Sequence, residues 1–381
     1  MSNILHVVNI YFVIPYFLGN QIKHFRSKGF NIHIICSPSK ELIKNSKEQG
    51  FQYKEIPVLR KISLINDIKA IWEITRYIKN NKIDIVNGHT PKGGLLSMIA
   101  GFVGGVKTRI YFRHGLVYET SSGLKRYLLI SMDRLASLLA TKIVCVSPSV
   151  YNRSIKDKLN PEWKQVVLSK GTCNGIDIKR FNKSNIDQNQ VNELKIKLGI
   201  NTNDFVIGFT GRLVRDKGII ELMEAFETIH QKYPGTKLLL VGMLEERDAL
   251  PLDTIERIKG NSSVIHTGYV DNKTIEQYYS LMNLFILPSY REGFPTSVLE
   301  ASSMELPIIT TRVTGCIDSI VPDKTGVFVD HNASTIANAI IPFVDDNSLC
   351  EEFGICGRKF VVDNFQEKIV WQEIEKLYRL P

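Results

Sequence analysis

The chain has 381 residues, of which 44% are apolar and 23% charged, an ordinary balance for a globular protein long enough to form two or three domains. Its six cysteines form no C-x-x-C pair and no Cys/His cluster with zinc spacing, so we expect reduced thiols in a cytosolic protein and no disulfide framework. The longest apolar stretches fall short of the roughly 20 residues of a membrane span. Residues 4–18 are apolar but have no Lys or Arg before them, so we expect a buried strand and loop there instead of a signal peptide.

Charge divides the chain into two unlike halves. Residues 1–170 hold 26 Lys and Arg against 10 Asp and Glu, a net charge of +16, while the remaining residues hold 22 against 29, a net charge of −7. The basic half favours an anionic surface or substrate, such as anionic lipid headgroups, although solubility alone would also explain it. Because no RNA- or DNA-binding motif with interleaved aromatic residues is present, we expect no nucleic acid partner.

Short apolar runs alternate with amphipathic stretches in both halves, which is typical of βαβ units in parallel sheets. The first half predicts strands at residues 4–10, 32–36, 83–86, 108–112, 143–146 and 166–168, and helices at 17–28, 64–80, 92–102, 125–140 and 148–158. Residues 171–190 are rich in turn formers and predict a linker. The second half predicts strands at 205–209, 237–241, 264–266, 284–287, 308–310 and 327–329, and helices at 218–232, 253–260, 272–281 and 296–304. A helical tail is expected over about 351–378, with a break near 354–357.

The most informative pair of residues is Glu292 and Glu300, which have seven residues between them and follow the expected strand at 284–287. The intervening segment contains turn formers and two candidate helix N-caps: Gly293, Pro295, Thr296 and Ser297. The free N–H groups of such a helix start favour an anion, typically a phosphate. Two carboxylates beside it suit a sugar nucleotide, one holding the ribose and the other the sugar. The alternative is a capped surface helix with two solvated glutamates.

This segment resembles the E-x7-E motif of retaining glycosyltransferases with the GT-B fold, in particular glycosyltransferase family 4. Three other segments resemble family motifs in the expected order: N-G-I-D at 174–177, G-F-T-G-R-L-V-R-D-K-G at 208–218, and T-G-C-I followed by T-G-V-F-V between 314 and 329. Each segment alone is a weak signal, but four in order at workable separations are a strong one. The resemblance covers most of residues 171–381 and, more weakly, residues 1–170.

The resemblance implies an α/β protein with two doubly wound, Rossmann-like domains that face a cleft. We expect an acceptor-binding domain at residues 1–170, a donor-binding domain at 171–364, and a C-terminal helix at about 365–381 that crosses back to the first domain. Arg212 and Lys217 would hold the donor diphosphate and offset the charge that develops on it. No cofactor or metal is expected, since no metal-binding D-x-D motif stands at a plausible strand end. The alternative for Arg212 and Lys217 is an ordinary surface loop with basic residues.

The resemblance also assigns the donor contacts. Glu300 would accept hydrogen bonds from the ribose, while Glu292 would lie against the donor sugar as nucleophile, charge stabiliser or positioning group. The backbone at Val270 would hold the base, and the other implied contacts are Gly293, Phe294, Pro295, Thr296, Ser297 and Val298. The first βα loop departs from the family, because it has the single Gly19 among aromatic residues where many members have two glycines. Gly19 would allow close approach of the diphosphate, or the apolar loop would contact lipid.

The first half contributes candidate residues for the acceptor side. His114, in the sequence R-H-G, resembles the family's H-G element, whose imidazole faces the donor sugar; a structural histidine is the alternative. Arg113 beside it would reach an acceptor phosphate. The turn H-T-P-K, with His89 and Lys92, would receive an acceptor anion at a helix start, or form a plain turn.

The sequence therefore predicts a retaining glycosyltransferase that moves a hexose or N-acetylhexosamine from a UDP-sugar to an anionic, lipid-linked acceptor in surface polysaccharide assembly. The expected catalytic residues are His114, Arg212, Lys217 and Glu292. We expect a cytoplasmic protein that is peripheral on the inner membrane surface through its basic first domain. The alternatives are a UDP-sugar epimerase of the same fold, a sugar-nucleotide-binding scaffold without turnover, and a basic nucleic-acid binder.

Overall fold

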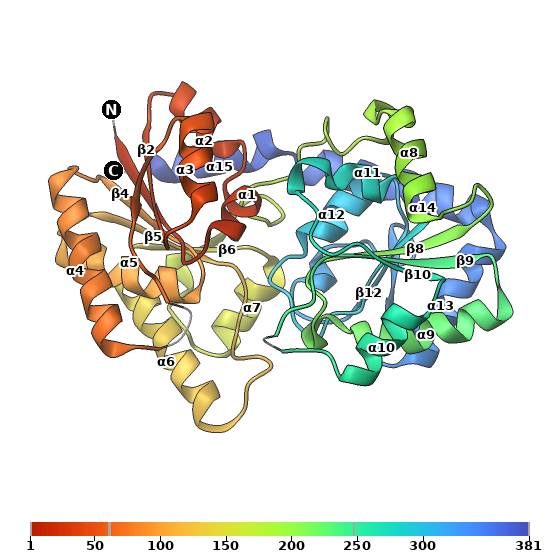
Figure 1. Ribbon diagram of the computed structural model, residues 1–381. Coiled ribbons are helices and arrows are strands. Elements are labelled where there is room, and N and C mark those ends of the chain that lie inside the picture. The colour runs from red at the N-terminus through yellow and green to blue at the C-terminus, as the bar shows by residue number, and fades with distance from the viewer. Residues whose placement is uncertain (1, 60–61, 247, 380–381) are drawn as a thin grey trace. The chain divides into compact units, whose positions relative to one another are not determined.

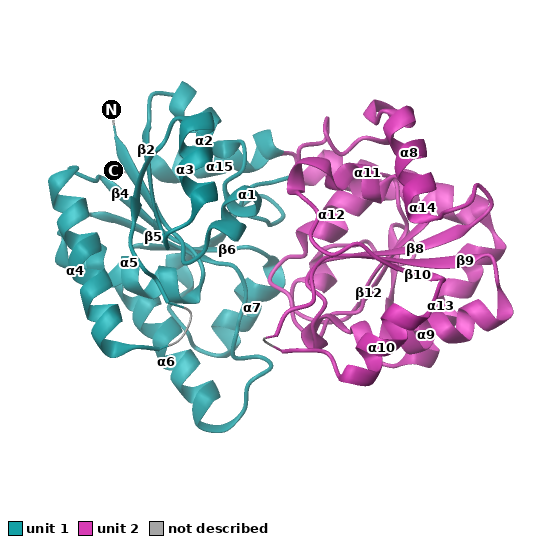
Figure 2. Cartoon of the chain, in the orientation of Figure 1, with its two compact units in different colours: residues 1–175, 367–381 teal, residues 176–366 magenta. Residues whose placement is uncertain are grey.

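The computed structural model describes residues 2–59, 62–246 and 248–379. The chain folds into two compact units: unit 1 comprises residues 1–175 and 367–381, and unit 2 comprises residues 176–366 (Figure 2). The sequence had predicted the two boundaries between the units at 170/171 and 364/365, whereas they lie at 175/176 and 366/367. Both units are built on parallel β-sheets covered by helices (Figure 1).

Unit 1 contains a parallel sheet with strand order β3-β2-β1-β4-β5-β6-β7. Its strands are β1 (Asn3–Val7), β2 (Asn31–Cys36), β3 (Gln52–Glu55), β4 (Ile85–Gly88), β5 (Thr108–Arg113), β6 (Lys142–Cys145) and β7 (Gln165–Val167). Its helices are α1 (Ile14–Phe17), α2 (Gln21–Ser27), α3 (Lys40–Gln49), α4 (Leu64–Asn80), α5 (Pro91–Val103), α6 (Gly123–Leu139), α7 (Pro148–Lys156) and α15 (Glu367–Tyr378). The strand order reverses direction between β1 and β4, so α2 and α3 cover one face while α4, α5 and α6 cover the other.

Unit 2 contains a second parallel sheet, with strand order β10-β9-β8-β11-β12-β13. Its strands are β8 (Phe205–Thr210), β9 (Thr236–Val241), β10 (Val264–His266), β11 (Leu284–Leu287), β12 (Ile308–Thr311) and β13 (Gly326–Val329). Its helices are α8 (Gln188–Leu198), α9 (Ile219–Lys232), α10 (Leu252–Gly260), α11 (Ile275–Tyr279), α12 (Thr296–Ser303), α13 (Ala333–Asp345) and α14 (Asn347–Asn364). All four residues of β11 are buried, because a parallel sheet covered on both faces requires continuous apolar strands. The two sheets and the doubly wound pattern confirm the predicted fold class.

Some elements differ from the prediction for identifiable reasons. Strand β3 was missed because it lies at the sheet edge, where three of its four side chains are exposed and no apolar run is needed. The polar helix α3 was missed although Ser39 caps its start, its Oγ accepting from the Leu42 N–H at 3.1 Å, and Gly50 ends it in the left-handed region. Within the described residues, no helix is both long and apolar enough to cross a membrane.

The break expected near residues 354–357 was wrong. Gly354 and Gly357 lie inside the continuous helix α14, and the break falls between α14 and α15. A Cβ atom on Gly354 would lie 2.2 Å from the Glu305 carbonyl oxygen, so the glycine allows α14 to pack closely against the end of α12. A glycine in a helix thus marks close backbone approach here instead of a helix end.

We expect Gly354→Ala to lower the thermal unfolding midpoint of unit 2, because the new methyl group must displace backbone atoms, an overpacking cost of about 1–3 kcal/mol. Gly260→Ala is the matched control. Gly260 also lies in a helix, but a Cβ there would meet nothing within 4 Å, so this change should be neutral or slightly stabilising. Equal midpoints for both variants, measured by differential scanning fluorimetry and calorimetry, would contradict the packing argument.

Candidate active site

The predicted donor residues of unit 2 lie in loops and in the first turns of α12, at one edge of its sheet. The strand order reverses between β8 and β11, and ligands of open parallel sheets bind beyond the carboxyl ends of the strands at such a switch point. Arg212 and Lys217 follow β8, and Glu292 follows β11. These two loops are held together by a hydrogen bond from the Tyr290 N–H to the Asp216 carbonyl, 2.9 Å long.

Lys217 and Glu292 form an ion pair across these loops, and both side chains are mostly buried. Glu292 Oε1 also accepts a hydrogen bond of 2.8 Å from the Ser289 hydroxyl. Gly218, directly after Lys217, has φ +70°, and a Cβ on it would lie 2.1 Å from the Pro288 carbonyl oxygen. The glycine therefore permits the close approach of the two loops that brings the ammonium to the carboxylate.

Arg212 is the more exposed of the two predicted cations. Its guanidinium donates to Glu245 Oε2 at 2.8 Å, and 39% of its side chain is accessible to solvent. Glu245 follows β9, and a Cβ on Gly242 in the same loop would lie 1.7 Å from the Gly211 carbonyl oxygen. The loops after β8 and β9 are therefore packed together, so Arg212 is presented at the carboxyl edge of the sheet.

Glu300 differs from Glu292 in being buried, with 6% of its surface exposed. The Tyr279 hydroxyl on α11 donates to Glu300 Oε2 at 2.8 Å, and the same hydroxyl lies 2.7 Å from Thr210 Oγ1 at the end of β8. Burial raises the pKa of Glu300 to about 7, against the opposing effects of the Tyr279 hydrogen bond and the Arg180 charge. Glu300 is therefore a carboxyl that changes charge near neutral pH.

The start of α12 differs in one respect from the prediction. The N-cap residue is Pro295 and no side chain caps the helix, whereas Thr296 or Ser297 was expected in that position. Gly293, Phe294, Thr296, Ser297 and Val298 lie in the loop and first turn as predicted. A third loop meets this segment, since Gly315, with φ +84°, lies so close that a Cβ would be 2.4 Å from the Gly293 carbonyl oxygen.

Val270 lies in the loop after β10, half-buried against the core of unit 2. This loop is joined to the one after β9 by the pairing of Gly268 with Gly242, and by a 2.9 Å hydrogen bond from His266 Nε2 to the Gly242 carbonyl. The loops after β8, β9 and β10 thus form one connected edge, which includes the backbone expected to hold the base.

In unit 1, His114 follows β5 and its ring stacks on Phe17, with centroids 3.6 Å apart. Gly19 has φ +41°, and a Cβ on it would lie 2.7 Å from Asn174 Nδ2. Asn174 in turn accepts a 3.1 Å hydrogen bond from the Trp371 indole N–H. Gly19 therefore has a packing role within unit 1, which the sequence did not indicate.

The three residues expected to bind an acceptor anion are occupied inside unit 1, contrary to prediction. Arg113 is fully buried, where its guanidinium donates to Asp133 at 2.7 Å and to Ser137 at 2.6 Å. Lys92 is 6% exposed and is paired with Asp67 of α4. Both ring nitrogens of the buried His89 face other histidines, His6 and His114. These side chains stabilise the unit, so they do not offer charge to a ligand.

Sequence reasoning missed the residues that position the predicted site. The hydrogen-bond partners of Glu292, Glu300 and Arg212 are Ser289, Tyr279 and Glu245 respectively, and no local pattern marks them. Tyr290 also belongs here, since its ring stacks on His331 at 4.0 Å and its hydroxyl donates to Glu221 at 2.6 Å. Of these residues, only Tyr290 could have been suspected from the sequence, because it lies directly before Arg291 and Glu292.

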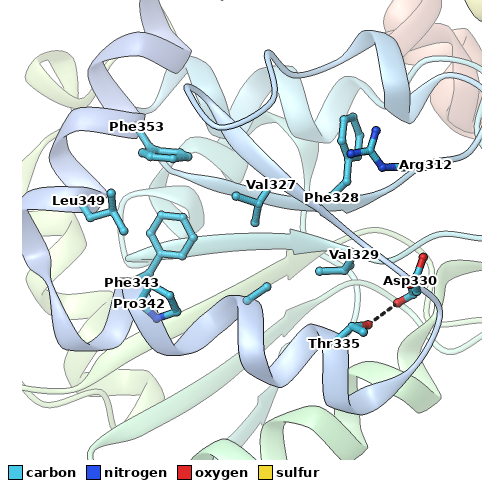
Figure 3. Close-up of a pocket in the computed structure, with 11 residues that line it drawn as sticks. Arg312, Val327, Phe328, Val329, Asp330, Thr335, Pro342, Phe343, Leu349 and Phe353 are labelled. Carbon is cyan, nitrogen blue, oxygen red and sulfur yellow. Dashed lines mark hydrogen bonds between the residues drawn. The ribbon is translucent and has the colours of Figure 1, made fainter.

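A pocket of about 370 Å³ elsewhere in unit 2 contains none of the predicted site residues (Figure 3). It lies between β13, α13 and α14 and is lined mainly by apolar side chains, among them Phe328, Pro342, Phe343, Leu349 and Phe353. The Arg312 guanidinium at its edge lies over the Phe328 ring, 4.5 Å from the centroid. Among the described residues, no group of three His, Cys, Asp or Glu side chains is placed to hold a metal ion.

Comparison with known sequences relates both units to one class of enzyme. The family model of glycosyl transferases group 1 matches residues 190–360, and a glycosyl transferase 4-like model matches residues 4–147. The chain is 37% identical to the capsular polysaccharide biosynthesis glycosyltransferase CapM of Staphylococcus aureus over 378 residues, 99% of this chain and 97% of CapM. It is 26% identical to an Escherichia coli UDP-Gal:α-D-GlcNAc-diphosphoundecaprenol α-1,3-galactosyltransferase, over 88% of this chain and 85% of that one.

Solved structures agree in fold. A glycosyltransferase from Rickettsia africae superposes with a TM-score of 0.79 at 20% identity, over 99% of this chain and 98% of that one. Anabaena Alr3699/HepE, solved with UDP and glucose, superposes with a TM-score of 0.83 at 17% identity, with full coverage of both chains. The near-complete match to CapM, the two family models and the paired Rossmann-like sheets together establish that the chain is a GT-B glycosyltransferase and belongs to glycosyltransferase family 4, the glycosyl transferases group 1.

Proposed function

We propose that this glycosyltransferase moves a hexose or N-acetylhexosamine from a UDP-sugar to a lipid-linked acceptor during surface polysaccharide assembly, with retention at the anomeric carbon. The observation that carries the proposal is the convergence of Lys217, Glu292 and Arg212 on the switch point of unit 2. The names of the relatives support its finer terms. CapM acts in capsular polysaccharide biosynthesis, and the E. coli relative is named for a UDP-sugar donor and a diphosphoundecaprenol-linked acceptor.

In this proposal Arg212 and Lys217 bind the donor diphosphate. Both cations are held by carboxylates, Glu245 and Glu292, which keep them at the edge of the sheet. As the bond between sugar and phosphate breaks, negative charge grows on the diphosphate, and two fixed cations lower the energy of that state without a metal or cofactor. Arg212 offers a planar fork of donors, while Lys217 acts as a point charge.

Glu292 and Glu300 have different parts in this proposal. Glu292, which is oriented by Ser289 and neutralised by Lys217, lies against the donor sugar. Glu300, which is oriented by Tyr279, accepts hydrogen bonds from the ribose hydroxyls. The acceptor hydroxyl attacks the same face of the sugar that the diphosphate leaves, and the leaving phosphate oxygen takes its proton. The backbone at Val270 holds the base, and residues 293–298 hold the diphosphate and sugar.

We expect Lys217→Ala to reduce turnover by about 10²–10³-fold and to weaken donor binding, because the variant lacks one of the two cations that stabilise the leaving diphosphate. Lys259→Ala, which removes an exposed lysine from α10, is the matched control. Turnover is measured as UDP release with a diphosphoundecaprenol-linked acceptor, and binding as a thermal shift with UDP-sugars. Equal loss in both variants would contradict the site assignment, and an epimerised UDP-sugar formed without acceptor would indicate an epimerase.

We expect donor affinity to depend on the ionisation of Glu300. Ribose hydroxyls donate to the ionised carboxylate, so below the pKa of about 7 Glu300 must lose its proton when the donor binds. The Kd should therefore rise by up to about tenfold for each unit by which the pH falls below about 7. The other charged groups near Glu300 are Arg180 and Glu276, which pair with each other. Calorimetric titration with UDP-glucose from pH 5.5 to 8.5 tests this, since its diphosphate diester does not titrate in that range.

Glu300→Gln is the control for that titration. The amide retains the shape of the side chain but carries no charge, so its donor affinity should be weaker at pH 8 and nearly independent of pH. A wild-type Kd that is flat between pH 5.5 and 8.5, or a slope that persists in Glu300→Gln, would remove Glu300 from the proposed ribose contact.

Attachment to an anionic membrane surface is the remaining part of the proposal, and one face of unit 1 supports it. Helices α4, α5 and α6 pack side by side on one face of the sheet. Leu64, Ile65, Ile68 and Trp72 of α4 are between 60% and 83% exposed. The outer side of α6 and the end of α5 are also apolar, with exposed Phe102, Val103, Leu124, Tyr127 and Leu138.

Exposed cations lie among these apolar side chains. Lys69 and Arg76 are on α4, Lys125 is on α6, and the Arg76 guanidinium lies 5.5 Å from the Trp72 ring centroid. Apolar residues that enter the interface together with cations that meet anionic headgroups are the two parts of a peripheral membrane-binding face. Such a face would place the chain on the cytoplasmic membrane surface, where a lipid-linked acceptor lies.

We expect the double variant Ile65→Glu, Ile68→Glu to bind vesicles of anionic phospholipid at least about tenfold more weakly, because burial of each isoleucine contributes about 1.5–3 kcal/mol. Ile196→Glu, on an exposed site of α8 in unit 2, is the control and should bind as wild type. Vesicle flotation and the change in tryptophan fluorescence report binding. If the double variant floats as efficiently as the control, the α4 face is not the attachment surface.

A further inference from the structure

Three histidines form a hydrogen-bonded row in unit 1. His6 Nδ1 lies 3.0 Å from His89 Nε2, and His89 Nδ1 lies 3.0 Å from His114 Nε2. His6 is on β1, and the other two follow β4 and β5, so the row crosses three neighbouring strands at their carboxyl ends. We call His6, His89 and His114 the histidine row. His6 and His89 are buried, whereas His114 is half-buried under the Phe17 ring.

The buried end of the row meets an amide. Asn87 Nδ2 lies 3.4 Å from His6 Nε2 and 2.7 Å from the Tyr378 hydroxyl oxygen of α15. Asn87 Oδ1 is buried and has no hydrogen-bond partner among the described residues. If the amide were rotated by 180°, its NH₂ group would occupy the present position of Oδ1 and would have no acceptor there. Because buried N–H groups without partners are rarer than under-satisfied carbonyl oxygens, the geometry favours Asn87 as the donor to His6.

All three rings are neutral in this environment. Burial is the largest influence on each, and it lowers the pKa of His6 and of His114 to about 3 and that of His89 well below its usual value. A neutral imidazole has one N–H donor and one acceptor nitrogen. In a row of neutral rings, each contact needs one donor and one acceptor, so every hydrogen in the row must point in the same direction.

The amide decides which direction that is. If Asn87 donates to His6 Nε2, that nitrogen is an acceptor and His6 carries its hydrogen on Nδ1, which donates to His89 Nε2. By the same argument His89 donates through Nδ1 to His114 Nε2. His114 is then left with its hydrogen on Nδ1, the nitrogen that faces away from the row.

We propose that Asn87, acting through His6 and His89, fixes His114 as the Nδ1–H tautomer and so makes it a neutral hydrogen-bond donor toward the substrate. This rests on the proposed function and on the expectation, from the family resemblance, that the His114 imidazole faces the donor sugar. A donor of this kind binds a hydroxyl or phosphate oxygen and takes no proton from the acceptor. Asn87, His6 and His89 are positioning residues, and the two buried histidines explain why the anion expected at His89 has no place there.

The test reads the tautomers directly by NMR, with the full chain labelled with ¹⁵N-histidine and without substrate. Long-range ¹H–¹⁵N correlation distinguishes the two tautomers from the shifts of the two ring nitrogens, and comparison with His114→Gln assigns the His114 signals. We expect His6, His89 and His114 all to be Nδ1–H, the form less favoured by free histidine in water, at pH 6 and at pH 8. An Nε2–H or protonated His114 in the wild-type protein would overturn the proposal.

Two variants separate the role of the amide from that of its neighbour. Asn87→Leu removes the donor but retains a similar volume, so the His114 shifts should move to those of a tautomer mixture. Tyr378→Phe removes the hydroxyl but retains the Asn87 contact with His6, so the tautomer should persist. An unchanged His114 in Asn87→Leu, or an equal change in Tyr378→Phe, would contradict the role of Asn87. Because no turnover is measured, this result is independent of whether the proposed reaction is correct.

Discussion

The parallel arrangement of the strands is the constraint on which both the candidate donor site of unit 2 and the histidine row of unit 1 depend. Every ladder between the named strands runs parallel, so the loop after each strand emerges at the same edge of its sheet. In unit 2 this places Lys217, which follows β8, beside Glu292, which follows β11, although 75 positions separate them. In unit 1 it aligns three histidines from β1 and the ends of β4 and β5. Glycines such as Gly218 and Gly242 then allow the loops to approach within backbone contact.

The local sequence pattern was sufficient to predict strands with continuous apolar runs and the loops that follow them. The buried run at 284–287 identified β11, and Glu292, which was expected in the loop after it, lies there. The pattern failed where an element needs no apolar run, as in the edge strand β3, and where glycines serve packing, as in α14. It also could not assign partners. Tyr279 meets Glu300 and Asn87 meets Tyr378 only because the folded chain brings them together, 21 and 291 positions apart.

The net charge of the first half overstates the positive charge that its surface offers to an external partner. Arg113 and Lys92 contribute to the positive total but lie buried against Asp133 and Asp67, where removal of one partner would leave an uncompensated charge. Charge that meets an external partner must come from exposed residues such as Lys69 and Lys125. A count of charges thus limits the strength of the surface field, while burial decides how much of it reaches the solvent.

The position of α15 has a consequence for how the protein is made. Unit 2 is one continuous stretch, residues 176–366, but unit 1 needs residues 367–378 as well as residues 1–175. Trp371 donates to Asn174 and Tyr378 packs between Phe25 and Phe30, so the core of unit 1 is closed by a helix that leaves the ribosome after all of unit 2. The first half of the chain is therefore held incomplete while nearly two hundred residues are added, and it exposes apolar surface throughout that time. Unit 2 is therefore the first unit whose residues are all synthesised, and Asn87, beside the histidine row, gains its partner Tyr378 only after α15 has been made.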